Sequence, residues 1–172
     1  MTQRVDTMEI TEKSKFNDEW ILWYHHFPDN WKLDGYKQIY TITNIQDFWT
    51  LLDNMSIIGG ITSLHFFFMR KGVTPLWEDE KNKNGGCWSI KITKDMATDI
   101  WELLSILLVT EQILNRSPET VNGLSICVKN NTSAIVKIWI SNNSNNSIKN
   151  LNKKIVDKFG YNIIYKHNNP EY

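Results

Sequence analysis

Cysteine is scarce in this 172-residue sequence, which contains only Cys87 and Cys127. Two cysteines make neither a disulfide framework nor a metal-binding cluster. Arginine is also rare, and lysine supplies most of the 19 basic residues. Because 19 acidic residues balance them, the formal net charge is zero. Capture of long nucleic acids by bulk charge is therefore not expected, and any anion-binding site must be local.

Long apolar runs are absent as well. No stretch approaches the roughly 20 apolar residues that a membrane-spanning helix needs. The N-terminal stretch MTQRVDTMEITEKSK is polar and lacks the apolar segment of a signal peptide. We therefore expect a soluble, cytoplasmic, monomeric protein without a membrane segment. It would have a flexible tail over residues 1–15 and a single domain over residues 16–172, which is long enough to bury a sizeable core.

Hydrophobic periodicity and turn residues predict an α+β protein. The predicted strands cover residues 19–27, 36–42, 64–72, 87–92, 122–130, 133–141 and 161–167, and the predicted helices cover 43–55, 94–114 and 143–160. Thr43 and Gln46 match a capping box at the start of the first helix. Short connections between strands indicate an antiparallel sheet, with the helices covering one face. The other face is left for a ligand.

Tryptophan is abundant by contrast, with eight residues in the chain. Two of them, Trp31 and Trp77, fall in polar loops that leave strands. One such tryptophan often lies over the core as a lid, but a pair of exposed indoles is suited to stacking a planar ligand or a sugar ring. Glu78 follows Trp77, and its carboxylate could accept two parallel hydrogen bonds from the N1–H and 2-amino groups of guanine. A guanine methylated at N7 is cationic, which favours both the indoles and the carboxylate.

The stretch PLWEDEKNKNGGCW, which ends at Trp88, resembles the signature loop of the messenger-RNA cap-binding protein, translation initiation factor 4E. WILWY, IQDFWTLL and VKNNTSAIVKIWIS resemble further segments of that family, in the same order, between Trp20 and His167. The resemblance implies a curved antiparallel sheet with three helices on its convex face and a slot for 7-methylguanosine triphosphate on its concave face. It also implies that Trp31 and Trp77 sandwich the methylguanine, that Glu78 binds its edge and that Trp139 packs against the N7-methyl group. For Trp139, plain core packing is the alternative.

The phosphate-binding positions of the family are altered in this chain. Cys87 and Ile135 stand where the family has basic residues. Lys129 fits a third basic position if the hairpin tip carries one extra residue. Lys137 has the strand parity of Trp139, so it could reach the same face. We expect Lys129 and Lys137 to bind the phosphates, although solubility alone could explain any one lysine.

A partner site is also implied on the opposite face. In the predicted helix 94–114, Ile106, Val109 and Ile113 form a second apolar stripe, and an exposed apolar stripe indicates a partner. The family binds its 4G scaffold and 4E-binding repressors there, through a short partner helix. The matching positions here are Ile45, Trp49, Ile106 and Val109. Packing of this stripe within the chain is the alternative.

These features together predict a non-catalytic initiation factor that binds capped messenger RNA and recruits it for translation through a scaffold. A cap-binding competitor that represses translation without a scaffold is the alternative. A carbohydrate-binding module also uses paired tryptophans, but Glu78 argues against it. An enzyme acting on caps is disfavoured, because no nucleophile–base pair or set of metal-binding carboxylates is evident. Neither a cofactor nor a metal is expected.

Overall fold

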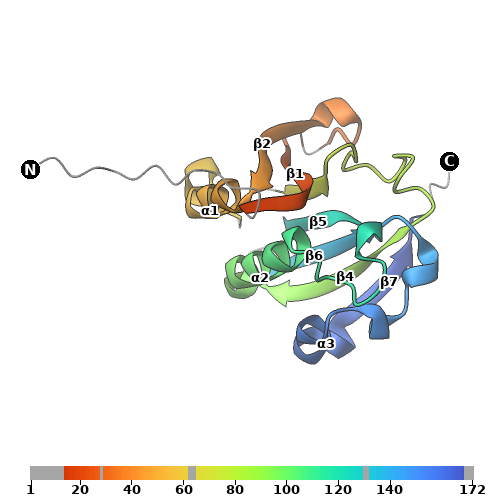
Figure 1. Cartoon of the computed structure of the whole chain (residues 1–172). Helices are drawn as coiled ribbons and strands as arrows, with labels where there is room; N and C mark the ends of the chain where they lie inside the picture. Colours follow the sequence, from red (N-terminus) through yellow and green to blue (C-terminus); the bar gives the residue numbers. More distant parts are fainter. Residues whose placement is uncertain (1–13, 28, 62–64, 130–131, 169–172) are drawn as a thin grey trace, which may run out of the picture.

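The computed structural model describes residues 14–27, 29–61, 65–129 and 132–168. Seven strands form one sheet in the order β2-β1-β3-β5-β6-β4-β7, and every neighbouring pair is antiparallel (Figure 1). The strands are β1 (Lys15–His25), β2 (Tyr36–Asn44), β3 (His65–Arg70), β4 (Gly86–Thr93), β5 (Val121–Val128), β6 (Ser133–Ile140) and β7 (Ile163–His167). The predicted antiparallel α+β fold is confirmed.

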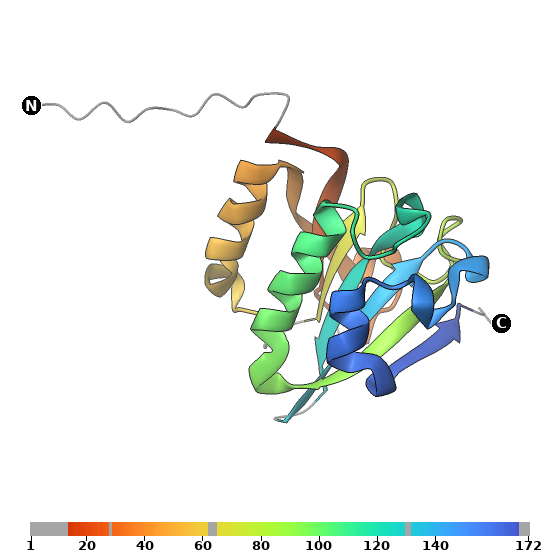
Figure 2. The ribbon, with the colours of Figure 1, turned by 60° about the horizontal axis from the view of Figure 1, so that its bottom comes forward.

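Three α-helices lie side by side on one face of the sheet, as Figure 2 shows. They are α1 (Ile45–Asp53), α2 (Ala97–Val109) and α3 (Lys153–Phe159). We call the face that they cover the convex face and the opposite one the concave face. Among the described residues, no helix is both long and apolar enough to cross a membrane. The predicted tail over residues 1–15 lies outside the described residues except for Ser14 and Lys15, and Lys15 already belongs to β1.

Strand alternation divides the core into two unequal parts. Side chains that point to the convex face join a large cluster with the helices, which includes Trp20, Phe68 and Trp88. Side chains that point the other way form a smaller cluster, made up of Ile21, Trp23, Tyr36, Phe67, Met69, Val73, Cys87 and Trp139. Since successive residues of a strand face opposite sides, this second cluster is a consequence of the register of the same strands. It forms the floor of the concave face.

The start of α1 differs from the prediction by one residue. Asn44, rather than Thr43, is the N-cap, and its side chain accepts a hydrogen bond of 2.9 Å from the Asp47 N–H. The Asp47 carboxylate in turn accepts hydrogen bonds from the backbone N–H and the hydroxyl of Thr43. Gln46 was therefore wrongly assigned, because Asp47 is the residue that closes the reciprocal cap.

Helix α2 is shorter than the predicted span 94–114. Residues Lys94–Met96 form a separate 3₁₀ turn, and the α-helix ends at Val109. Glu111 then adopts a left-handed conformation with φ 55°, and the Gln112 N–H donates back to the Leu107 carbonyl at 2.7 Å. This is the geometry of a Schellman C-cap, which glycine normally occupies. The Glu111 carboxylate accepts hydrogen bonds from Asn17 and Arg70, and these contacts hold the strained residue in place.

The predicted helix over 143–160 is also mostly wrong, because only α3 is α-helical there. Asn142 accepts a hydrogen bond from the Ser144 N–H, and Asn152 accepts one from the Lys154 N–H. Asparagine side chains that bind nearby backbone groups compete with helix formation and favour caps. The asparagine-rich segment therefore forms short turns, and the helix begins only after Asn152.

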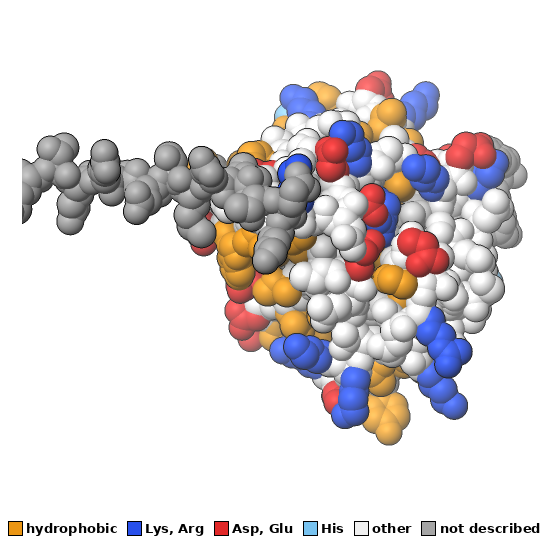
Figure 3. All heavy atoms as spheres, in the orientation of Figure 1, with side chains coloured by type: hydrophobic (Ala, Val, Ile, Leu, Met, Phe, Trp, Pro, Cys, Tyr) orange, Lys and Arg blue, Asp and Glu red, His pale blue; other side chains and the backbone are white. Residues whose placement is uncertain are grey.

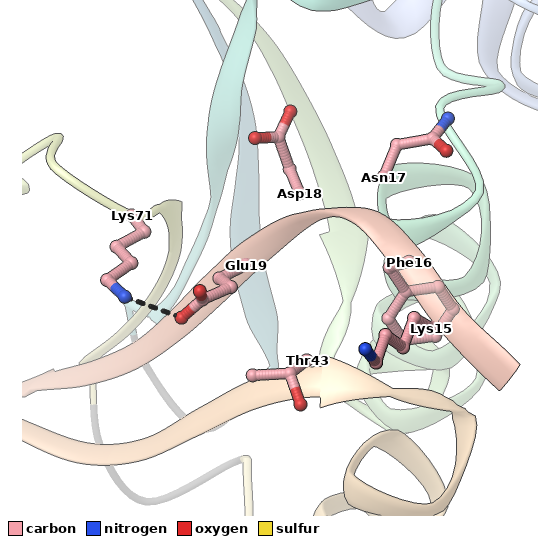
Figure 4. A pocket seen from close by; sticks show the side chains of 7 residues that line it. All are labelled: Lys15, Phe16, Asn17, Asp18, Glu19, Thr43 and Lys71. Carbon is pink, nitrogen blue, oxygen red and sulfur yellow. Dashed lines mark hydrogen bonds and ion pairs between the residues drawn. The ribbon is translucent and has the colours of Figure 1, made fainter. Parts of the chain in front are cut away.

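The first half of β1 does not follow β2 closely. Lys15 pairs with Asn44 and Trp20 pairs with Ile42, so β1 arches away between the two points. A pocket of about 470 Å³ opens at this arch, lined by Lys15, Phe16, Asn17, Asp18, Glu19, Thr43 and Lys71. Figure 4 shows the Lys71 ammonium paired with the Glu19 carboxylate at its edge. None of the predicted site residues lines this pocket.

Candidate functional site

Trp31 lies in the loop between β1 and β2, and its exposure is confirmed at 58%. Its indole packs on the imidazole of His25, with ring centroids 4.4 Å apart. The other side of His25 stacks on Tyr36, at a centroid distance of 4.6 Å and an interplanar angle of 28°. The Nε2 atom of His25 lies 2.7 Å from the Asn30 carbonyl oxygen and ties the ring to the loop. The two stacked rings of His25 and Tyr36 therefore form an aromatic column that supports Trp31 from below and leaves part of the indole open.

Trp77 lies in the loop between β3 and β4 and is 49% exposed, as predicted. The loop is held around Asp79, whose carboxylate accepts hydrogen bonds from the backbone N–H and the hydroxyl of Thr74 and from the Lys81 N–H. An aspartate side chain that accepts hydrogen bonds from several nearby backbone N–H groups stabilises a turn that has no strand partner. Within the described residues, no ring contact joins Trp77 to Trp31.

A buried asparagine holds the base of the same loop. Asn82 is fully buried, and its amide donates to the Thr74 and Leu76 carbonyls at 2.9 and 2.7 Å. Its side-chain oxygen accepts a 2.8 Å hydrogen bond from Asn122 of β5. Asn168, which follows β7, donates to the Asn82 carbonyl at 3.0 Å. Trp77 and Glu78 are therefore positioned by a network that joins the loop to both β5 and the end of β7.

Glu78 is exposed and lies beside the aromatic column. Its charge and the burial of the phenol together raise the pKa of Tyr36 to about 12, with burial as the larger cause. The carboxylate is therefore close enough to the concave face to act on a group there. Trp77 borders the same face, because the ammonium of the concave residue Lys137 lies 5.3 Å from the centroid of its ring.

His65 completes the floor below Trp31. Its ring contacts Phe67 at 4.3 Å and Trp31 at 6.1 Å between centroids. Burial is the main cause that lowers the pKa of His65 to about 3, and the charges of His25, Lys129 and Lys137 contribute the rest. The imidazole is therefore neutral at physiological pH. A neutral aromatic floor does not repel a cationic ring bound above it.

Trp139 and Cys87 lie deeper than Trp31 and Trp77. Trp139 is only 2% exposed, and its indole N–H donates to the Ser125 hydroxyl at 3.1 Å. The Cys87 thiol is also buried and donates to the Asn168 side-chain oxygen at 3.6 Å. Burial raises the pKa of this thiol to about 12, so it carries no charge at neutral pH. Both residues therefore belong to the floor of the site.

The two lysines predicted to bind phosphate both lie at the concave face. Lys137 is half-buried below Trp77, and Lys129 is exposed just beyond β5. Both act on the pKa of His65, which shows that they border the same region. The described residues contain no group of three or more His, Cys, Asp or Glu side chains that could hold a metal ion.

The apolar surface predicted on the convex side is only partly present. Ile45 and Trp49 are 43% and 44% exposed, and Ile106 is half-buried. Val109 is buried in the main core, as is Ile113, which lies beyond the helix end. The expected exposure of the second stripe was therefore wrong for these two residues. Hydrophobic side chains also gather at the left of the view in Figure 3, on the side where α1 lies.

Local sequence patterns did not identify several residues of the site. His25 and His65 are single residues in aromatic strands, and nothing nearby indicates that their rings meet. Asn82 stands among other polar loop residues, and its partners lie 40 and 86 residues away in the chain. Strand periodicity does assign each histidine to a face, which is the one signal that could have drawn attention to them.

Comparisons with known proteins agree with the fold and with the sequence motifs. A family profile described as eukaryotic initiation factor 4E matches residues 15–171. The chain is 32% identical over 114 residues to the Arabidopsis thaliana eukaryotic translation initiation factor NCBP, which covers 64% of this chain and 49% of the relative. It is 31% identical over 127 residues to Caenorhabditis elegans eukaryotic translation initiation factor 4E-1, covering 70% of this chain and 58% of the relative. The matches thus span about half the length of these relatives.

Solved structures with the same fold include two nematode proteins. Ascaris suum eIF4E-3, in complex with an m7G cap, has a TM-score of 0.76 and 22% identity, and the match covers 92% of this chain and 93% of that one. C. elegans eIF4E-3, in complex with the 4E-binding protein Mextli, has a TM-score of 0.75 and 19% identity, with coverage of 90% and 93%.

Truncation of Asn82 should loosen the loop that carries Trp77. In Asn82→Ala, the Thr74 and Leu76 carbonyls and the Asn122 amide lose a buried partner, and unfolding in urea should become easier by about 2–3 kcal/mol. Hydrogen exchange of the backbone amides between Thr74 and Gly85 should speed up more than exchange in α2. The exposed Asn162→Ala is the control. Wild-type exchange in the loop of Asn82→Ala would refute this role.

The low pKa of His65 predicts a loss of stability in acid. The unfolded state binds a proton near pH 6.5, whereas the folded state does so only near pH 3. The contribution of neutral His65 to the free energy of unfolding is therefore fully present above pH 6.5 and is lost as the pH drops toward 3. At pH 5 the loss amounts to about 2 kcal/mol. His65→Phe should reduce the difference between urea midpoints at pH 7.5 and pH 5, and the exposed His167→Phe should reduce it less. An unchanged difference in His65→Phe would contradict the assignment.

Proposed function

The chain belongs to the eukaryotic initiation factor 4E family, and we propose that it binds the 7-methylguanosine cap of messenger RNA between Trp31 and Trp77. One observation carries the proposal: two half-exposed indoles border the concave face from different loops, each supported from below by its own contacts. Surface tryptophans with open faces are suited to stacking a base, at about 1–3 kcal/mol per base. The cap is bound without chemical change.

The charges around the indoles favour a methylated guanine over a plain one. Glu78 lies close enough to Tyr36 on the concave face for its charge to raise the pKa of the Tyr36 phenol. Its two oxygens would accept the N1–H and 2-amino hydrogens of guanine. Methylation at N7 makes the ring cationic, so it gains attraction from the carboxylate and from the indoles, the latter about 0.5–2 kcal/mol. The neutral state of His65 avoids repulsion from below.

The remaining cap contacts are assigned to Trp139, Lys129 and Lys137. Trp139 lies in the floor, where the edge of its ring would meet the N7-methyl group of a base held above it. Lys137 is next to Trp77 and would bind the first phosphates that leave the stacked base. Lys129 would reach them from the exposed end of β5. A structure of a relative with the same fold, Ascaris suum eIF4E-3, is described as a complex with the m7G cap, which supports cap binding as the proposed function.

We further propose that the convex side recruits a scaffold resembling initiation factor 4G or a 4E-binding repressor, so that bound mRNA enters translation in the cytoplasm. Ile45 and Trp49 project from α1 as exposed apolar side chains, and Ile106 of α2 is half-exposed. An apolar helix face is the kind of partner that such a surface binds. Val109 would support the surface from within the core. Relatives from C. elegans and a schistosome are described in complexes with 4E-binding proteins.

The cap proposal is tested on immobilised 7-methyl-GTP. The protein should be retained and should elute with 7-methyl-GTP but not with GTP. Trp31→Ala and Trp77→Ala should each lower the affinity about 10- to 100-fold, because each removes one stacking face. Trp49→Ala, on the opposite side, is the matched control and should bind the cap normally. Equal elution by the methylated and plain nucleotides would overturn cap binding.

The partner proposal is tested with a fluorescent peptide that carries the helix of a 4E-binding protein. Trp49→Ala should weaken binding by about 30-fold in a fluorescence anisotropy titration, because buried tryptophans dominate such interfaces. Trp31→Ala is the reciprocal control and should leave peptide binding intact. If the wild-type protein binds the cap but no such helix, the scaffold role is wrong and the competitor that represses translation becomes the function.

A further inference from the structure

The concave face is positively charged over one half of the sheet. Strands β4, β6 and β7 send the side chains of Lys91, Lys137 and Lys166 to this face, as judged by the alternation with buried convex residues. None of these three strands, nor β5, contains an aspartate or glutamate. In a chain whose formal net charge is zero, this separation creates a local site for an anion.

The strand register gathers the three lysines around one serine. Ser89 of β4 pairs directly with Lys137 of β6, and Lys91 is two residues further along β4. On the other side, Cys87 pairs directly with Lys166 of β7, which is therefore diagonal to Ser89. Directly opposed side chains have Cβ atoms about 4.5–5.5 Å apart, and diagonal neighbours are about 7–8 Å apart. The three lysines thus lie around Ser89 on the same face of the sheet.

Two short side chains, Cys87 and Ser89, lie between the lysines on β4, and Ile164 of β7 pairs directly with Ser89. Cys87 is buried and uncharged, and Ser89 is half-buried. Lys91 and Lys166 are both exposed, whereas Lys137 is half-buried against Trp77. Within residues 14–27, 29–61, 65–129 and 132–168, no ion pair engages any of these three lysines. Their charges are therefore available to a ligand.

We propose that Lys91, Lys137 and Lys166, arranged around Ser89, bind the triphosphate of the cap and direct it across β4 toward the β7 edge. The inference rests on the proposed function, because Lys137 next to Trp77 marks where the phosphates leave the stacked base. Lys91 and Lys166 then meet the phosphates farther from the base. Lysine binds a phosphate as a point charge on a flexible stem, so several lysines share a chain of phosphates without a fixed geometry.

The test compares 7-methylguanosine triphosphate with the monophosphate by quenching of tryptophan fluorescence at several salt concentrations. Lys91→Gln and Lys166→Gln should each weaken triphosphate binding about two- to fivefold, as expected for exposed ion pairs, and the double variant about tenfold. Monophosphate binding should stay unchanged. The slope of log affinity against log salt should become shallower by about one for each lysine removed. Lys154→Gln, exposed on α3 at the convex side, is the matched control.

The possible outcomes separate this inference from the cap proposal. A wild-type protein that binds 7-methyl-GTP and GTP equally well would overturn cap binding itself. A double variant that keeps wild-type triphosphate affinity, while Lys129→Ala loses it, would overturn only the path across β4 and place the phosphates along the β5–β6 hairpin. Equal weakening toward the monophosphate and the triphosphate would also overturn the path, because it indicates a general effect on the site.

Discussion

Side-chain alternation in the antiparallel sheet is the constraint on which the other features depend. Each strand sends successive residues to opposite faces, so the register decides what meets the helices and what meets a ligand. In β6, Ile138 joins the main core, whereas Lys137 and Trp139 face the concave side. A slip of one residue would exchange these positions and bury a lysine under the helices. The fold and the site are therefore fixed by the same pairings.

The concave face is completed by two loops that are held in different ways. Trp31 rests mainly on the stacked rings of His25 and Tyr36, and one hydrogen bond between His25 Nε2 and the Asn30 carbonyl oxygen joins these rings to the loop. Trp77 is carried by a loop whose backbone is bound by Asn82 and Asp79 through directed hydrogen bonds. Hydrogen-bonded networks restrict geometry more tightly than stacking does. The two indoles are thus positioned independently, one on a packed column and one on a fixed loop.

Charge is distributed along the concave face in the order that a capped nucleotide would need. Glu78 lies at the end near Tyr36 and the aromatic column. Lys91, Lys137 and Lys166 lie on strands β4, β6 and β7, farther along the sheet. A methylated guanine is cationic and its phosphates are anionic, so the ligand carries both signs at separate ends. In the proposed complex, the surface would oppose each end with the complementary charge, although the formal net charge of the chain is zero.

The sequence by itself determined the strands, the number of helices and the exposure of Trp31 and Trp77, because periodicity and polar loops are local properties. It failed at the end of α2, where Glu111 is held in its turn by Arg70, 41 residues away. The fold also decided that Val109 is buried and that Lys166 stands opposite Cys87. Local periodicity assigns a side chain to a face, but only the pairing of distant strands determines its neighbours.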